Sequence, residues 1–127
     1  MKRILIFLIV GFMMPFVLLA QNDMDDIIIA LKNGDAQQLA AFFDNKVELS
    51  VPGKTSTYNK SQAESVINDF FNNNKIQSFE EKHKGKNNGM EYCIGNAVTS
   101  NGIYKTTFFT KLKSNKQLIQ TLRFESN

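Results

Sequence analysis

The hydrophobic pattern of the chain begins with an apolar run at residues 4–19, which follows Lys2 and Arg3 and leads to Ala20 and a polar stretch. A short basic region, an apolar segment and a small residue at the cleavage position are typical of an export signal. The run is shorter than the about 20 residues that a membrane-spanning helix needs. We therefore predict a signal peptide at residues 1–20, export to the periplasm or the medium, and no stable membrane insertion after cleavage. The alternative is a short N-terminal membrane anchor.

Two helices are predicted at the start of the remaining domain, residues 21–127. Apolar residues at helical spacing mark the first helix, and Gly34 suits the left-handed position that ends it. The apolar stripe of this helix comprises Met24, Ile27, Ile28 and Leu31. Asp35 then fits the N-cap of a second, short helix, with Gln38 three residues further on. The apolar side predicted for that helix comprises Leu39, Phe42 and Phe43.

A strand and a third, longer helix follow. Alternation of apolar and polar residues predicts a half-buried strand that stops at Pro52, and residues 54–58 are interpreted as a polar connection. The apolar side of the strand comprises Val47, Leu49 and Val51. Ser61 and Glu64 have the spacing of a capping box, which predicts the start of the third helix. Its apolar stripe comprises Ala63, Val66, Ile67, Phe70 and Phe71.

The C-terminal part of the domain has the pattern of a β-meander. Three turn sequences divide it, namely Asn88-Gly89, Asn101-Gly102 and Ser114-Asn115. Asn-Gly is a strong hairpin signal because both central residues of the turn need a positive φ. The segments between the turns are rich in aromatic and β-branched residues, which favour strands. These segments are residues 76–86, 90–99, 103–113 and 117–125. We therefore predict an α+β fold in the order α-α-β-α-β-β-β-β, with an antiparallel sheet packed on the third helix.

Two-residue turns also predict which side chains share a face of the sheet. The expected pairs in the first hairpin are Phe79 with Val98, Glu81 with Asn96, and His83 with Ile94. We continue this register through the other turns to predict the face under the third helix. Its apolar residues are Phe79, Ile94, Val98, Phe109, Leu118, Leu122 and Phe124. The polar residues on this face are Glu81, His83, Tyr92 and Asn96. The opposite face receives Cys93, Gly95, Ala97, Tyr104, Phe108, Leu112 and Ile119. Because three helices cannot easily cover two apolar faces, we predict a homodimer.

Composition and charge narrow the classes of function. One Cys and one His leave no disulfide framework and no zinc cluster. Of the 15 basic residues, removal of Lys2 and Arg3 leaves 13 against 12 acidic ones. The lysines are scattered and no stacking aromatics accompany them, which argues against nucleic-acid binding. The glycines stand apart rather than in a phosphate-binding loop. We predict no cofactor and no metal.

Three segments and the order of the elements resemble known proteins. The segments are Tyr58–Glu64 leading to Phe70 and Phe71, then Phe79–Gly85, then Tyr92–Gly95. The element order resembles the nuclear-transport-factor-2-like (NTF2-like) superfamily, with its ketosteroid isomerases, scytalone-dehydratase-type enzymes and SnoaL-like cyclases. The segments are similar to an exported bacterial family known as domain of unknown function 4783. The resemblance covers residues 21–127. It implies a cone-shaped, cystatin-like fold, a pocket between the long helix and a curved sheet, and frequent dimers through the sheet. It implies no established activity.

The candidate ligand-binding residues are Glu81, His83, Tyr92 and Asn96, because the predicted register places them on the face of the implied pocket. Glu81 or His83 could move a proton near neutral pH while Tyr92 polarises a carbonyl, as in a cofactor-free isomerase or dehydratase. No segment matches a catalytic motif of the superfamily, so no catalytic residue is assigned. The main hypothesis is therefore non-catalytic binding of a small hydrophobic ligand or a protein partner.

Two structural features would change these hypotheses. A bulge in the strand at residues 76–86 would turn His83 away from the pocket. A pocket filled by the protein's own side chains would leave a pure interaction module. A third hypothesis is a structural subunit of an envelope assembly.

Overall fold

Three helices and six strands make up residues 22–127, the part of the chain that this computed structural model describes. In chain order they are α1 (Asp23–Asn33), α2 (Ala36–Ala40), β1 (Phe43–Val51), β2 (Lys54–Asn59), α3 (Lys60–Asn73), β3 (Ile76–Asn87), β4 (Met90–Thr99), β5 (Gly102–Lys113) and β6 (Lys116–Ser126). The predicted signal peptide, residues 1–20, lies outside the described residues. Among residues 22–127, no helix has the length and apolar character needed to cross a membrane.

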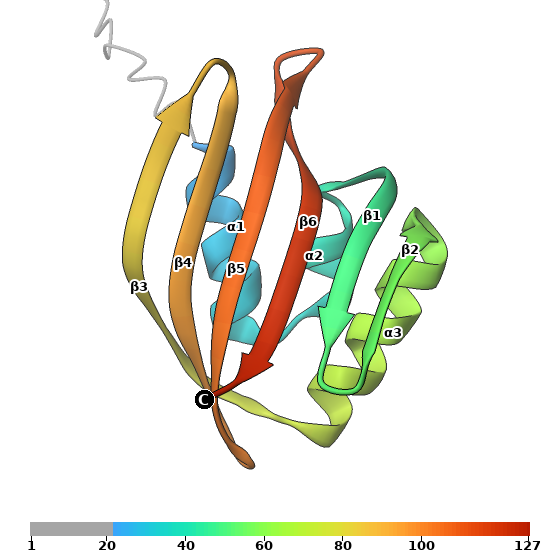
Figure 1. Cartoon of the computed structure of the whole chain (residues 1–127), viewed down its shortest axis with the longest axis vertical. Coiled ribbons are helices and arrows are strands. Elements are labelled where there is room, and N and C mark those ends of the chain that lie inside the picture. The colour runs from blue at the N-terminus through green and yellow to red at the C-terminus, as the bar shows by residue number, and fades with distance from the viewer. Residues whose placement is uncertain (1–21) are drawn as a thin grey trace, which may run out of the picture.

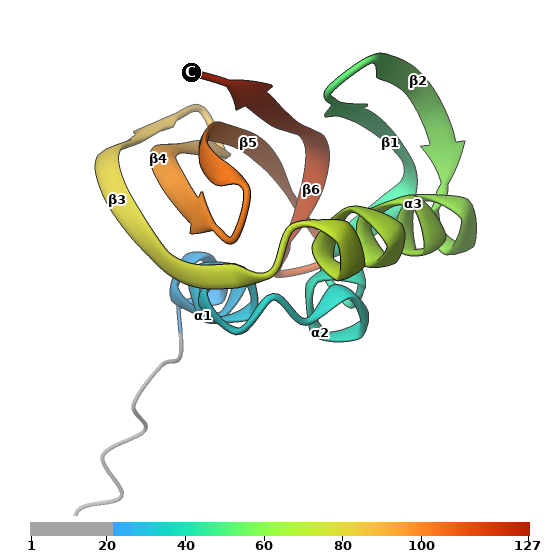
Figure 2. The same cartoon turned by 90° about the horizontal axis from the view of Figure 1, so that it is seen from below.

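All six strands belong to one curved sheet in the order β2-β1-β6-β5-β4-β3. The neighbours are antiparallel, apart from β1 and β6, which run parallel. Figure 1 shows the strands in front of the helices, and Figure 2 shows that all three helices lie on the same side of the sheet. The predicted α+β fold class is confirmed. We call the side that packs against the helices the helix face and the other side the open face.

The caps of the first two helices form as the sequence predicts. Asn22 accepts a hydrogen bond from the backbone of Met24 at 3.0 Å, and Gly34 ends α1 with a φ of 59°. Asp35 accepts from the backbone of Gln38 at 3.0 Å and begins α2. α2 ends at Ala40, so Phe42 and Phe43 are not part of its apolar side, and Phe43 is the first residue of β1.

The structure corrects the prediction for residues 54–60 in two respects. Residues 54–58, expected as a polar connection, belong to the edge strand β2, which pairs with β1. Most β2 residues are exposed, so the strand lacks the apolar alternation that would have revealed it. The cap of α3 is Asn59 rather than Ser61. Asn59 and Gln62 exchange hydrogen bonds and form the capping box two residues earlier than predicted from Ser61 and Glu64.

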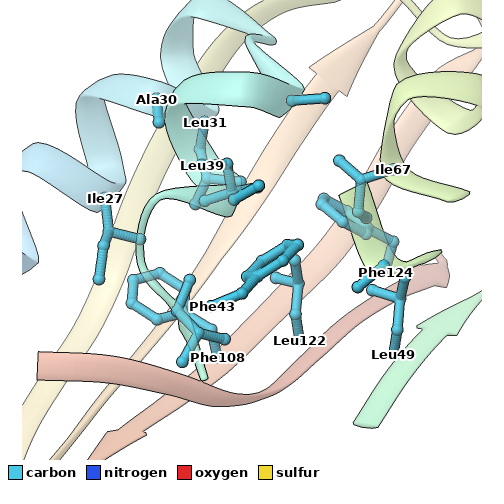
Figure 3. Close-up of a cluster of buried hydrophobic side chains, with 14 of the residues drawn as sticks. Ile27, Ala30, Leu31, Leu39, Phe43, Leu49, Ile67, Phe108, Leu122 and Phe124 are labelled. Carbon is cyan, nitrogen blue, oxygen red and sulfur yellow. The ribbon is translucent and has the colours of Figure 1, made fainter. Parts of the chain in front are cut away.

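The core lies between the helices and the helix face of the sheet. Figure 3 shows the largest side chains in this layer, contributed by α1, α2, α3 and the central strands. Phe43, Phe108 and Phe124 are almost completely buried, and Phe70 of α3 stacks on Phe124 with ring centroids 4.6 Å apart. The space between the helices and the sheet is therefore filled mainly by aromatic and aliphatic side chains of the protein itself.

Two β-bulges change the register that the turns alone predict. The turns at Asn88-Gly89 and Ser114-Asn115 form as expected, and His83 pairs with Ile94 as predicted. Lys82 then lies opposite no residue of β4, and Gln120 lies opposite no residue of β5. Beyond each bulge, the side chains shift to the other face.

The composition of the two faces is consequently different from the prediction. The observed pairs are Phe79 with Ala97 and Glu81 with Gly95, so the predicted pairs with Val98 and Asn96 are wrong. The helix face receives Phe79, Cys93, Gly95, Ala97, Phe108, Ile119, Leu122 and Phe124. The open face keeps Ile94, Val98, Phe109 and Leu118, which the prediction had placed under the third helix.

Candidate functional site

The bulge at Lys82 separates the two residues that the acid–base hypothesis combined. Glu81 pairs with Gly95 on the helix face, whereas His83 pairs with Ile94 on the open face. Because neighbouring residues of β4 point to opposite sides, the carboxylate and the imidazole lie on opposite faces of the sheet. The structure therefore does not bring Glu81 and His83 together.

Glu81 belongs to a charged cluster that joins β3 to the start of α1. The Nζ of Lys84 lies 3.3 Å from Glu81 and 3.6 Å from Asp25. Burial alone would lower the pKa of Lys84, but the carboxylates of Glu81 and Asp25 raise it above its ordinary value. Lys84 therefore stays protonated, and the cluster is an ion-pair contact between a helix and the sheet.

Cys93 lies on the helix face near this cluster and is fully buried. Burial raises the pKa of its thiol to about 11, and the nearby Glu81 carboxylate adds to the effect. A nucleophilic thiol requires exposure and a lowered pKa. Cys93 is therefore a packing residue.

The other three candidate residues lie on the open face. His83 is exposed, while Tyr92 and Asn96 are half-buried. The ring of Tyr92 covers Gly85, where a Cβ atom would overlap it, and lies 6.2 Å from the ring of Phe109. These residues share a face, but none of the helices within residues 22–127 lies over it (Figure 2).

Apolar side chains gather on the open face. On β4, β5 and β6 they form two groups, Tyr92, Ile94, Phe109 and Leu118 towards one end and Val98 with Ile103 towards the other, and the row of Asn96, Lys105 and Glu125 lies between the groups. Ile103 is 45% exposed and the other apolar residues are half-buried. We call the apolar residues of both groups the apolar strip. Sequence reasoning identified an apolar second face but assigned several of its residues to the wrong side.

Two of the surface hollows lie beside candidate elements of the predicted pocket. One, of about 310 Å³, lies between the β1–β2 turn, the C-terminal end of α3 and Tyr104 of β5. The other, of about 180 Å³, lies beside the first turn of α1, and Tyr92 is among the residues that line it. The first hollow lies between α3 and the sheet, where the family resemblance implies a pocket, but its wall at the β1–β2 turn was not predicted because residues 54–58 were interpreted as a polar connection. Among residues 22–127, no three His, Cys, Asp or Glu side chains are arranged to hold a metal ion.

The fold places the chain in a class of proteins with known architecture. The chain shares the architecture of the NTF2-type protein Rd1NTF2_04, with a TM-score of 0.65 and 17% identity over 80% of this chain and 95% of that one. This comparison establishes the NTF2-like fold and nothing further.

The family follows from closer comparisons. The model of the family DUF4783, a domain of unknown function, matches residues 24–125, and the chain belongs to this family. A DUF4783 protein of Bacteroides uniformis is 31% identical, with a TM-score of 0.80 over 84% of this chain and 98% of that one. A DUF4783 protein of Bacteroides ovatus is 30% identical, with a TM-score of 0.77 over 80% of this chain and 93% of that one. No curated protein matches the chain.

Proposed function

We propose that the domain is exported and acts as a non-catalytic interaction module that binds a second copy of itself through the open face of its sheet. The proposal is supported chiefly by the apolar strip, which lies on the face that α1, α2 and α3 leave uncovered. Apolar side chains that gather on a sheet face and remain partly exposed are typical of interaction surfaces. Tyr92 and Phe109, which pair towards one end of the strip, are aromatic residues of the kind enriched in interfaces.

The filled core favours a surface interaction over a ligand enclosed in the cone. Phe43, Phe108 and Phe124 occupy the layer in which an enclosed ligand would lie. The acid–base alternative needed Glu81 or His83 beside Tyr92 in the pocket. Glu81 lies on the opposite face from Tyr92, and His83 and Tyr92 both lie on the open face, outside the packed layer. A binding surface on the outside of the sheet therefore agrees best with the geometry.

The charges around the strip favour a second copy as the partner. Arg123 forms an ion pair with Glu48 at 3.5 Å, and Lys105 lies in register with Glu125. These opposite charges are balanced within one chain, so an oppositely charged partner is not required. A two-fold interface, in which the same surface meets itself, fits a surface that combines apolar groups with balanced charges.

The mass of the protein in solution tests the proposal. Light scattering at high micromolar concentration should give a dimer for the unchanged protein and a monomer for Phe109→Glu and Ile94→Glu. The matched control is Ile29→Glu, which places the same charge on α1 at a residue that is 45% exposed and should leave the dimer intact. A strictly monomeric mass for the unchanged protein would overturn the proposal, as would a dimer in both strip variants.

A further inference from the structure

The hollow at the C-terminal end of α3 has an apolar floor that is fixed in place. Its apolar residues come from three elements and comprise Val51, Val66, Phe70 and Tyr104. Phe70 contacts Tyr104 edge-on at 5.2 Å and stacks on the buried Phe124. The floor is therefore part of the core, and a ligand would meet a preformed surface. The volume of about 310 Å³ is at the small end of the range for ligand pockets, about 300–1,000 Å³.

The side-chain amide of Asn74, at the rim of the hollow, already forms hydrogen bonds within the protein. The Oδ1 of Asn74 accepts hydrogen bonds from the hydroxyl of Tyr104 at 3.0 Å and from Asn101 at 3.1 Å. Its Nδ2 donates to the carbonyl oxygen of Phe70 at 3.0 Å. This network ties the end of α3 to the turn before β5. Because these hydrogen bonds occupy the Asn74 side chain, a charged ligand would be recognised by the charged residues that line the hollow.

Two side chains of opposite charge line the same hollow. Asp69 lies on α3 and Lys54 begins β2, and both are exposed. Among residues 22–127, no ion pair includes either of them. The last turn of α3 has no basic residue, so Asp69 adds to the negative potential of the helix C-terminus and favours a cation there. Lys54, whose Nζ lies 5.7 Å from the centroid of the Tyr58 ring, supplies a positive charge on the opposite wall, beside the β1–β2 turn.

We propose that this hollow binds a small zwitterion with an apolar side chain, of the class of free apolar α-amino acids. The ammonium group lies at Asp69, the carboxylate lies at Lys54, and the side chain covers Val66 and the Phe70 ring. A ligand of this class complements both charges and the floor together, whereas a simple amine or acid complements only one charge. The site is on the helix side of the molecule, so it does not depend on the proposed dimer.

Three probes that share one apolar group test this assignment by calorimetry on the purified protein. They are L-leucine, which has both charges, 3-methylbutylamine, which has only the positive one, and 4-methylpentanoate, which has only the negative one. L-Leucine should bind about three- to tenfold more tightly than either single-charge probe, because each lost ion pair is partly exposed. Equal affinity for the three probes, or no binding of L-leucine at millimolar concentration, would overturn the proposal.

Two surface variants separate the roles of the charges. Asp69→Asn should weaken L-leucine and the amine about three- to tenfold and leave the acid unchanged, and Lys54→Gln should do the reverse for the two single-charge probes. Glu64→Gln and Lys60→Gln are the matched controls, because both residues lie on α3 outside this hollow. If the controls weaken binding as much as the variants do, the ligand lies elsewhere.

Discussion

Lys113 Nζ lies 2.6 Å from Asp44 Oδ2, although the two residues are 69 positions apart in the chain. The same oxygen accepts a hydrogen bond from Gln120 Nε2 at 2.8 Å. Gln120 is the bulge residue of β6, so the buried carboxylate of Asp44 holds the bulge from the neighbouring strand. An acidic residue in β1 thereby helps to decide which side chains of β6 face the helices.

This contact predicts how stability depends on pH. The hydrogen bonds from Lys113 and Gln120 lower the pKa of Asp44 to about 2. An unfolded Asp has a pKa of about 3.9, so the folded state loses stability when protonation becomes possible, as the pH falls from about 5 towards 2. We expect a loss of about 1–2 kcal/mol in the free energy of unfolding, because Lys113 is half exposed and solvent screens its charge.

Urea unfolding at pH 7, 4 and 3 measures this loss. The variant Asp44→Asn should be less stable than the unchanged protein at pH 7, and the difference should shrink as the pH falls. Parallel loss of stability in the two proteins would show that Asp44 does not titrate in this range.

Substitution by Ala should lower the free energy of unfolding by different amounts at Gly95 and Gly85, which both lie within strands. A Cβ atom at Gly95 would overlap the carbonyl oxygen of Glu80 and the ring of Phe79, and the backbone atom cannot move aside. At Gly85 the overlap is with the far end of the Tyr92 side chain, which can rotate on the open face. We expect Gly95→Ala to cost about 2–3 kcal/mol and Gly85→Ala less than about 1.5 kcal/mol. Thermal unfolding of both variants checks this, and equal costs would contradict it.

The sequence predicts hairpin turns much better than it predicts bulges. Asn88-Gly89 needs a positive φ that few other residues tolerate, so its turn is a local property. Lys82 and Gln120 have no such local signature. The side chain of Gln120 is held by Asp44, 76 positions away, a contact that only the folded chain brings together. Four strands and their order could therefore be predicted, but which face each side chain occupies could not.

The prediction of the candidate site failed for the same reason, a β-bulge that has no local signature in the sequence. Glu81 and His83 are two positions apart and should share a face, but Lys82 between them is bulged out, so they pair with the adjacent residues Gly95 and Ile94 and lie on opposite faces. The lining of the hollow beside α3 could not be predicted for a different reason. One of its walls begins at Lys54, in an edge strand whose residues are polar on both sides.

Asn59 provides a prediction that separates the observed cap from the one expected from sequence. Its side chain accepts from the backbone of Gln62 at 2.8 Å, and Gln62 returns a bond to the backbone of Asn59 at 3.2 Å. Asn59→Ala should lower the free energy of unfolding by about 1 kcal/mol, whereas Ser61→Ala should change it by less than about 0.5 kcal/mol. Denaturant unfolding of both variants measures the difference. A larger cost at Ser61 would favour the cap predicted from the sequence.

Cys93 should be inert in the folded protein. It is fully buried, and burial raises the pKa of its thiol to about 11, so very little thiolate forms at pH 8. Iodoacetamide at pH 8 should therefore leave the native protein unmodified over hours and modify it completely in denaturant, as mass spectrometry can show. The control is Ser100→Cys in a Cys93→Ala background, since Ser100 is exposed in the turn between β4 and β5 and should react within minutes. If Cys93 reacted as fast as that exposed thiol, β3 and β4 would have to separate readily from α1, and the packed layer that excludes an enclosed ligand would not be rigid.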